Sequence, residues 1–510
     1  MPRKFHSRPN TVIMYPPPGE GEHDEMDEIM EETDASESKD KVYGPRGSIC
    51  DVYNLYQTKP DASGQISWSK KREKLDGPAE NSESSEYALV VRNVKCYDGR
   101  RSLSIHSIVI QSEVLKTFLE DIFAEYTGVT VKLERLEFKQ PFKPFVHRWE
   151  TFSQARDKVT DPTTKTNVDL LYRVLEEELG EVIARKKVLV QNGVITYDLV
   201  WTLFEPDAVL FNDAAGHDRA LKFITGEYVY QPSTLFRVFS SYIDCDGQSF
   251  GSRQEHIDIS AYAGTQPIVS LPVYPLQYHP SAETIRQRLI ARGARWEQLK
   301  RLPLQASRII IDAEAFNTFE PDQYVYLPRP LSDNLDDMGH LLATPTVRGY
   351  SLKDKKWLAF YLDGVREIQW DPRAFDLLVL PQTQQHLKQL ILACATAQSK
   401  GPDTFDDVVR GKGRGITLQL SGPPGVGKTL TVESVAEVMK VPLYVLSAGD
   451  LGTEPVDVEE NLKNILHMVP KWGAVLLLDE ADVFMEPRSS VDLTRNALVS
   501  IFLRMLEYYE

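Results

Sequence analysis

The last part of the chain is organised around one stretch, Ser421-Gly-Pro-Pro-Gly-Val-Gly-Lys-Thr429. From Gly422 it reads G-x-x-x-x-G-K-T, in which glycines let the backbone turn tightly and present successive N–H groups to phosphate oxygens. Lys428 supplies a cation for the β- and γ-phosphates, and the Thr429 hydroxyl can hold Mg²⁺. The stretch therefore predicts a nucleotide-phosphate site that consists of Gly422, Pro423, Pro424, Gly425, Val426, Gly427, Lys428 and Thr429.

The segments on both sides of this loop have the periodicity that a phosphate site requires. Residues 416–420 form a short apolar and β-branched run, which predicts a strand, and residues 429–439 have the spacing of a helix. The N-terminus of such a helix adds roughly half a positive charge beside the phosphates. The order of strand, loop and helix argues against a chance glycine turn.

A second motif follows an apolar run at 474–478, which predicts a fully buried strand. The run ends in Asp479-Glu480. A carboxylate at the carboxyl edge of a central strand can hold Mg²⁺ through water, and a second carboxylate can orient an attacking water molecule. The two motifs together predict a site of nucleotide hydrolysis, with Lys428 and Glu480 as catalytic residues and Thr429 and Asp479 as metal ligands.

The composition of the 510 residues limits the classes of partner and compartment. The formal net charge is −16, from 58 basic and 74 acidic side chains, which argues against broad binding to nucleic acid or anionic membranes. The four cysteines show neither metal spacing nor a disulfide framework. We find no secretory signal and no apolar run near the roughly 18 residues of a membrane helix. These features predict a soluble intracellular protein, without distinguishing cytoplasm from nucleus.

Changes in composition predict five segments and an α/β fold class. Residues 1–85, with an acidic run at 20–40, bury too little apolar surface to fold and predict a disordered acidic tail. This tail serves either as a docking segment for a basic partner or as a solvating segment. The other segments are a small α+β region at 86–160, a β-rich α+β accessory domain at 161–350, a connecting strand and helix at 351–400, and a parallel P-loop NTPase sheet at 401–510.

Local patterns predict the following elements in this order. Strands are expected at 88–91, 129–138, 194–204, 208–211, 226–230, 235–242, 256–262, 268–273 and 357–361. Helices are expected at 112–126, 167–187, 282–302 and 383–400, before a break at Gly401-Pro402.

The helix expected at 282–302 is strongly basic and surrounds Trp296 with six cationic side chains, Arg286, Arg288, Arg292, Arg295, Lys300 and Arg301. Two interpretations stay open for it. It forms either a surface for nucleic acid or an acidic partner, or a solvated face of an acidic protein. His217, His256 and His279 show no ligand spacing, so we expect no metal site there.

The two nucleotide motifs resemble those of AAA ATPases, which are ring-forming enzymes that couple ATP hydrolysis to remodelling of other macromolecules. The first is similar to the Walker A motif of that family, and Leu476-Leu-Leu-Asp-Glu-Ala-Asp482 is similar to its Walker B motif. More narrowly, the chain from about residue 165 onward resembles filamentous-fungal AAA ATPases with an uncharacterised β-rich domain before the ATPase module. The strings that carry this resemblance are Tyr197-Asp-Leu-Val-Trp-Thr-Leu-Phe204, Val347-Arg-Gly-Tyr-Ser-Leu-Lys-Asp-Lys-Lys-Trp357, Ser447-Ala-Gly-Asp-Leu-Gly-Thr453 and Arg495-Asn-Ala-Leu-Val-Ser500.

The resemblance implies ATP and Mg²⁺ as ligands, self-association into a hexameric ring, and a macromolecular client. It implies that Lys428 binds phosphates, that Thr429 and Asp479 hold Mg²⁺, and that Glu480 polarises the attacking water. Many AAA unfoldases grip a threaded polypeptide with an aromatic–aliphatic–glycine tripeptide in the loop after the second strand. Residues 448–456 contain no aromatic residue, which argues against peptide threading.

The resemblance also implies a polar sensor, an arginine finger and a helical lid beyond Glu510. An arginine finger contributes roughly 10³–10⁵ to turnover in well-studied phosphoryl-transfer systems. Four apolar side chains of the last helix, Leu498, Ile501, Phe502 and Met505, would lack part of their cover without those elements. We therefore expect the chain to be a C-terminally truncated AAA module.

Two other functions remain to be compared with an AAA ATPase. A regulatory or interaction module that binds ATP without hydrolysing it would fit the missing sensor and arginine finger. The string Asp479-Glu480-Ala481-Asp482 also spells the D-E-A-D motif of RNA helicases. Those enzymes place more chain between their nucleotide motifs and need a second similar domain, and the negative charge argues against RNA tracking.

Overall fold

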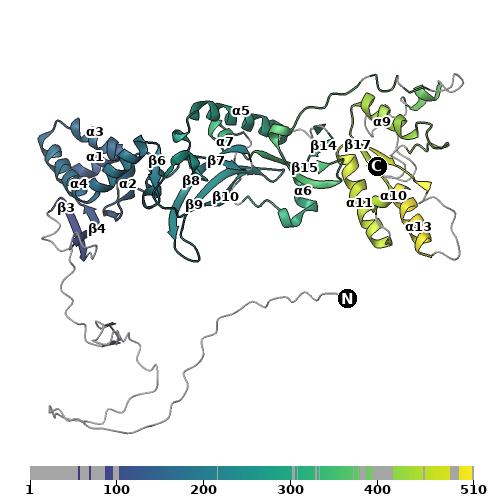
Figure 1. Cartoon of the computed structure of the whole chain (residues 1–510). Coiled ribbons are helices and arrows are strands. Elements are labelled where there is room, and N and C mark those ends of the chain that lie inside the picture. Colours follow the sequence, from purple (N-terminus) through teal and green to yellow (C-terminus); the bar gives the residue numbers. More distant parts are fainter. Residues whose placement is uncertain are drawn as a thin grey trace, which may run out of the picture. The chain divides into compact units, whose positions relative to one another are not determined.

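The structure is a computed structural model, and it divides the chain into two compact units, Met1–Ala79 and Glu80–Glu510. The described residues are 56–57, 68–69, 87–95, 103–391 (without 215, 301–304, 307, 328–329, 332–333, 372, 377 and 380–385), 393, 417–451, 454–482 and 493–507. In the first unit β1 (Tyr56–Gln57) and β2 (Trp68–Ser69) form an antiparallel pair, where the composition predicts a disordered tail. The rest of the predicted tail lies outside the described residues. Figure 1 labels most of the helices and many of the strands of the second unit.

The first core of the second unit combines the antiparallel sheet β3-β4-β5 with four helices. Its helix starts are encoded locally: the Ser112 side chain accepts a hydrogen bond from the N–H of Leu115 (3.5 Å), and Asp161 accepts one from Thr164 (2.7 Å). The elements are β3 (Leu89–Lys95), β4 (Leu103–Ile110), α1 (Glu113–Phe123), β5 (Leu136–Lys139), α2 (Lys143–His147), α3 (Trp149–Asp157) and α4 (Pro162–Gln191).

Two features of this core differ from the sequence-based expectation. The strand expected at 129–138 begins only at Leu136, which pairs with Ile110 at the end of β4, so earlier residues have no partner strand and form turns. The buried residues of α4 belong to this first core, whereas the next core begins at Ile195. The division between the two cores therefore follows α4 and does not fall at residue 160.

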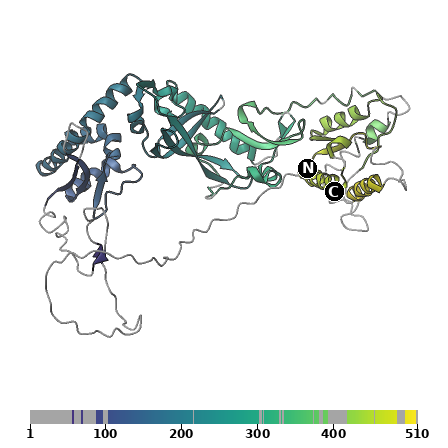
Figure 2. The same cartoon turned by 60° about the horizontal axis from the view of Figure 1, so that its bottom comes forward.

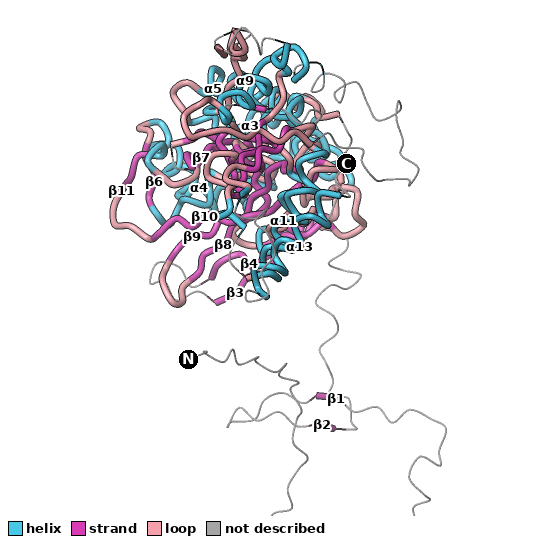
Figure 3. The backbone as a smooth tube through the Cα atoms, turned by 90° about the vertical axis from the view of Figure 1, so that its right-hand side faces the viewer, coloured by secondary structure: helices cyan, strands magenta, loops and turns pink. Residues whose placement is uncertain are grey.

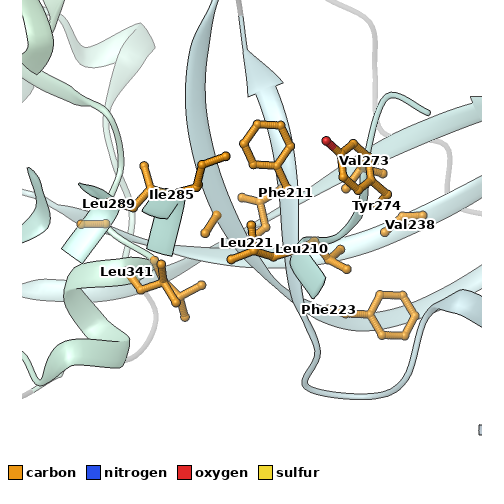
Figure 4. Close-up of a cluster of buried hydrophobic side chains, with 14 of the residues drawn as sticks. Leu210, Phe211, Leu221, Phe223, Val238, Val273, Tyr274, Ile285, Leu289 and Leu341 are labelled. Atoms are coloured by element: carbon orange, nitrogen blue, oxygen red, sulfur yellow. The ribbon is translucent and has the colours of Figure 1, made fainter. Parts of the chain in front are cut away.

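The second core is built on an antiparallel sheet with the order β10-β9-β8-β7-β12. Its strands are β7 (Val209–Ala214), β8 (His217–Val229), β9 (Leu235–Cys245), β10 (Phe250–Ser260) and β12 (Tyr274–Pro275). Figures 2 and 3 show the long strands β8, β9 and β10 side by side. Helix α5 (Ala282–Lys300) contributes Ile285 and Leu289 to the buried cluster that contains Leu210, Leu221 and Val238 of the sheet (Figure 4).

Two strands expected beside this sheet are helical instead. The segment at 194–204 pairs as β6 (Val194–Thr196) with β11 (Thr265–Pro267) and then turns into the 3₁₀ helix η2 (Tyr197–Leu203). Leu199, Val200 and Leu203 of η2 are buried, a spacing that a helical turn can direct to one side. The segment at 268–273 likewise starts as the 3₁₀ helix η3 (Ile268–Ser270). Further 3₁₀ turns are η4 (Leu276–Tyr278), η5 (Pro321–Gln323) and η6 (Leu362–Gly364).

The basic helix α5 is held inside the accessory core. Arg288 pairs with Asp218, Arg292 pairs with Asp363 (3.6 Å), and Arg295 donates to the carbonyl oxygen of Val365 (2.5 Å). Trp296 is buried and donates to the carbonyl oxygen of Thr346 (3.0 Å). These contacts occupy three of the six basic side chains of this segment within the domain, and Arg288 among them stays 59% exposed.

A second antiparallel sheet, β13-β14-β15-β16, completes the accessory core. Its elements are β13 (Gln305–Ala306), β14 (Ile309–Ile311), α6 (Ala313–Phe319), α7 (Asp337–Leu341), β15 (Thr346–Ser351) and β16 (Lys356–Tyr361). Arg348 of β15 joins this sheet to Asp244 of β9 through two contacts of 2.7 and 2.8 Å. In the connection that follows, residues 386–391 are helical, and most of the helix expected at 383–400 lies outside the described residues, as does Gly401-Pro402.

The C-terminal part contains α9 (Lys428–Met439), β17 (Leu443–Leu446), α10 (Ala448–Leu451), α11 (Pro455–Lys471), β18 (Val475–Leu478) and α13 (Leu493–Glu507). Strands β17 and β18 pair in parallel, which fits an α/β fold. Among the residues that the structure describes, no helix combines the length and apolarity needed to cross a membrane.

Three expectations for this part require correction. Residues 417–420 are exposed and irregular, because no described strand offers them a hydrogen-bonded neighbour. For the same reason β18, whose only neighbour among the described strands is β17, is half-buried and not fully buried. Phe502 in α13 is fully buried against the face that α11 contributes, so its expected lack of cover is wrong.

Candidate nucleotide-binding site

The glycine-rich loop has the backbone geometry that an anion cradle needs. Gly422, Gly425 and Gly427 have φ values of 155°, 83° and 87°, a region that residues with a Cβ atom rarely adopt. Helix α9 begins directly after Gly427, and no side chain caps it. The first N–H groups of the helix therefore have no acceptor within the helix, and together with the helix dipole they favour a bound anion.

The side chains of this loop fit the phosphates of ATP and a magnesium ion. Lys428 donates to the carbonyl oxygens of Gly422 (2.9 Å) and Pro423 (3.1 Å), so its ammonium group lies over the loop. A Cβ atom added at Gly425 or Gly427 would meet no atom within 4 Å, which leaves open space beside the backbone. Thr429 follows in the first turn of α9, and a hydroxyl group is a possible ligand for Mg²⁺.

The two carboxylates of the second motif follow the end of β18. Leu446 pairs with Leu478, and the N–H of Asp479 donates to the carbonyl oxygen of Leu446 (2.8 Å), which extends the parallel pairing by one residue. The N–H of Glu480 donates to Asp479 Oδ1 (3.1 Å). Glu480 is exposed and has a φ of 56°, a strained value for a residue that is not glycine and one often found at functional sites.

Helix α9, which begins in the first motif, and strand β18, which leads to the second motif, are in contact. The helix that carries Lys428 and Thr429 therefore lies against the strand that leads to Asp479. A phosphate-binding loop and an acidic strand end on adjacent elements can hold a nucleotide and its metal ion between them.

Sequence patterns alone did not single out Asp450 as a residue with a structural role in this domain. Asp450 in α10 accepts hydrogen bonds from both the N–H and the hydroxyl of Ser447 (each 2.7 Å), and it pairs with Lys355 of the accessory domain. Burial alone would raise the pKa of Asp450, but the donors Lys355 and Ser447 hold this pKa below its usual value. The spacing Ser447-Ala-Gly-Asp450 signals a local cap, whereas nothing in the local sequence points to Lys355.

Comparisons with known proteins agree with this geometry. Residues 418–510 match the family described as ATPase family associated with various cellular activities (AAA), and residues 185–280 match a domain of unknown function, DUF7025. Similar curated proteins include a Lon protease from Mycolicibacterium smegmatis (26% identical, covering 25% of this chain and 19% of the relative). Another is ATPase family AAA domain-containing protein 3 from Caenorhabditis elegans, which is 32% identical over 20% of this chain and 18% of the relative. A third is spastin from Dictyostelium discoideum, which is 27% identical over 29% of this chain and 22% of the relative.

The chain spans about a fifth of the length of these curated relatives. No solved structure matches it. The family match and the P-loop geometry cover the same residues, and residues 418–510 form an AAA ATPase domain with a P-loop NTPase fold.

Proposed function

We propose that this protein binds ATP with Mg²⁺ and hydrolyses it. The observation that carries the proposal is the left-handed glycine loop opening α9 beside the strand that ends in Asp479 and Glu480. Lys428 and the loop N–H groups bind the β- and γ-phosphates, and Thr429 and Asp479 hold Mg²⁺. The ion, when bound, neutralises charge that develops on the phosphates. Glu480 orients the attacking water.

We further propose that ATP hydrolysis drives the remodelling of a macromolecular client by a ring of subunits inside the cell. The resemblance to filamentous-fungal AAA ATPases supports this assignment, and the AAA match at 418–510 is compatible with it. The accessory core around β7–β10, which forms a larger buried cluster than the first core among the described residues, is our candidate for the part that contacts the client. Light scattering with and without ATP tests for the ring: a monomer under both conditions contradicts it.

The roles of the loop and the carboxylates can be separated by matched substitutions. Lys428→Ala should abolish binding of a fluorescent ATP derivative, whereas Lys463→Ala, an exposed lysine of α11, should leave it unchanged. Glu480→Gln should keep ATP binding and lower turnover by about 10²-fold or more. Glu460→Gln, at an exposed glutamate of α11 outside both motifs, is its control and should leave turnover unchanged. Equal ATP binding by the wild type and Lys428→Ala would refute the site.

A second function, ATP binding without hydrolysis, is favoured by one specific feature of the site. Glu480 is exposed to solvent, whereas a residue that orients an attacking water is expected to be shielded from solvent. A regulatory module of this kind would bind ATP with Mg²⁺, show no turnover, and respond to Lys428→Ala but not to Glu480→Gln. Single-turnover hydrolysis that depends on Glu480 excludes this alternative.

A further inference from the structure

A buried aromatic cluster connects the accessory sheet to the AAA domain. We call it the junction, and it consists of Tyr350 and Trp357 from the accessory sheet and Tyr444 and Trp472 from the AAA domain. The ring centroids of Tyr350 lie 5.8 Å from Tyr444, 5.4 Å from Trp472 and 5.1 Å from Trp357. Aromatic pairs at such distances add specific geometry to the burial of large apolar surfaces.

Polar contacts give the junction a defined orientation. The hydroxyl groups of Tyr350 and Tyr444 are buried and hydrogen-bonded to each other (2.9 Å), and burial raises the pKa of both phenols. The indole N–H of Trp472 donates to Asp312 (3.0 Å). At the edge of the junction, Lys355 pairs with Asp450 of α10. Buried polar groups are costly to leave unpaired, so these contacts favour one arrangement of the two parts.

The junction is connected to the predicted metal ligand by a short run of backbone. Tyr444 lies in β17, two residues before Leu446, whose carbonyl oxygen accepts the N–H of Asp479 (2.8 Å). Asp450 then fixes the turn after β17 by accepting the N–H of Ser447 (2.7 Å). The accessory domain therefore holds both β17 itself, through Tyr350, and the turn that follows it, through Lys355.

We propose that Tyr350 and Lys355 are positioning residues that hold the end of β17 so that Asp479 is presented to Mg²⁺. This inference rests on the proposed ATP site. A carboxylate that binds a metal ion must be held in position within a fraction of an ångström. The backbone of Asp479 is hydrogen-bonded to Leu446 of β17, and Tyr350 of the accessory domain is hydrogen-bonded to Tyr444 of the same strand. The accessory domain is, on this view, part of the metal site and not only a place where a client binds.

The test measures how strongly Mg²⁺ tightens nucleotide binding by the full chain. The dissociation constant of a methylanthraniloyl derivative of ATP is measured in Mg²⁺ and in EDTA. The value in EDTA divided by the value in Mg²⁺ gives a ratio that reports how much the bound metal ion tightens nucleotide binding. The variant Asp479→Asn gives the ratio expected when the metal-binding carboxylate is lost. Tyr350→Phe and Lys355→Met should each lower the ratio by about threefold or more, with the value in EDTA unchanged.

Two controls separate positioning from general damage. Lys355→Arg keeps the cation beside Asp450 and should restore the ratio, and Lys353→Met removes an exposed lysine from the same turn and should leave it unchanged. A ratio that stays at the wild-type value in both Tyr350→Phe and Lys355→Met would overturn this inference and leave the proposed function intact. An equal loss of affinity in EDTA would also overturn it, because it indicates a structural role only. Absence of nucleotide binding by the wild type would instead refute the proposed function.

Discussion

Two arginine–aspartate pairs have nearly the same geometry but differ greatly in burial. This difference predicts that the two pairs contribute very different amounts to the stability of the fold. Arg348 contacts both oxygens of Asp244 at 2.7 and 2.8 Å, and Arg237 contacts both oxygens of Asp258 at 2.8 and 2.9 Å. The Asp244 side chain is 1% exposed, whereas that of Asp258 is 32% exposed. The first pair joins two sheets of the accessory core, and the second lies between neighbouring strands.

Replacing each arginine with methionine keeps much of the side-chain volume and removes the charge. Arg348→Met leaves a buried carboxylate without its main partner, which costs about 3–5 kcal/mol in comparable buried pairs. Arg253 at 3.4 Å and the N–H of Cys245 at 2.8 Å still contact Asp244, so we expect a cost near the lower limit. Arg237→Met should cost at most about 1 kcal/mol, because water and salt screen an exposed pair.

Hydrogen–deuterium exchange measures these costs as the local free energy of opening in peptides from β9 and β15. Arg348→Met should increase exchange in both strands, since the pair joins them, and Arg237→Met should leave β15 unchanged. Equal effects of the two substitutions would refute the reasoning, because burial would then not decide the energy of the pair.

Three further predictions concern the rest of the chain. Phe502→Ala in α13 should cost about 3–5 kcal/mol because the side chain is 0% exposed, while Leu503→Ala, at 47% exposed, should stay within about 0.5 kcal/mol; denaturant unfolding of both variants decides this. Gly293→Ala should destabilise the fold, since its Cβ would meet a backbone carbonyl of α7, whereas Gly180→Ala in α4 has space and should gain up to about 1 kcal/mol in thermal unfolding. Burial lowers the pKa of His147 to about 3, so on acidification the unfolded chain binds a proton at this histidine before the folded chain does. The contribution of His147 to the free energy of unfolding should therefore be fully present above about pH 6.5 and fall by up to about 1.4 kcal/mol per pH unit below it. Denaturant unfolding at a series of pH values measures this, and a pH-independent free energy of unfolding would contradict it.

Much of the nucleotide site could be predicted from the sequence because its determinants are local. The loop conformation depends on glycines at Gly425 and Gly427, and the start of α9 follows them directly. The apolar run before Asp479 predicts a strand, and β18 confirms it. By contrast, the strand expected at 416–420 is absent from the described structure, since a strand requires a neighbour that no local pattern reveals.

Tertiary structure decided the features that depend on residues far apart in the chain. Six basic residues at 286–301 looked available for a partner, but three of them, Arg288, Arg292 and Arg295, contact Asp218, Asp363 and the carbonyl oxygen of Val365. The string around Tyr350 and Lys355 suggested a resemblance without a role, and only the tertiary structure shows its contacts with Tyr444 of β17 and with Asp450. The sequence alone determined the backbone conformation of the glycine-rich loop and predicts its phosphate chemistry, because neighbouring residues set backbone conformation. The fold decided which residues contact β17 and the turn after it, because burial and charge pairing depend on distance in space.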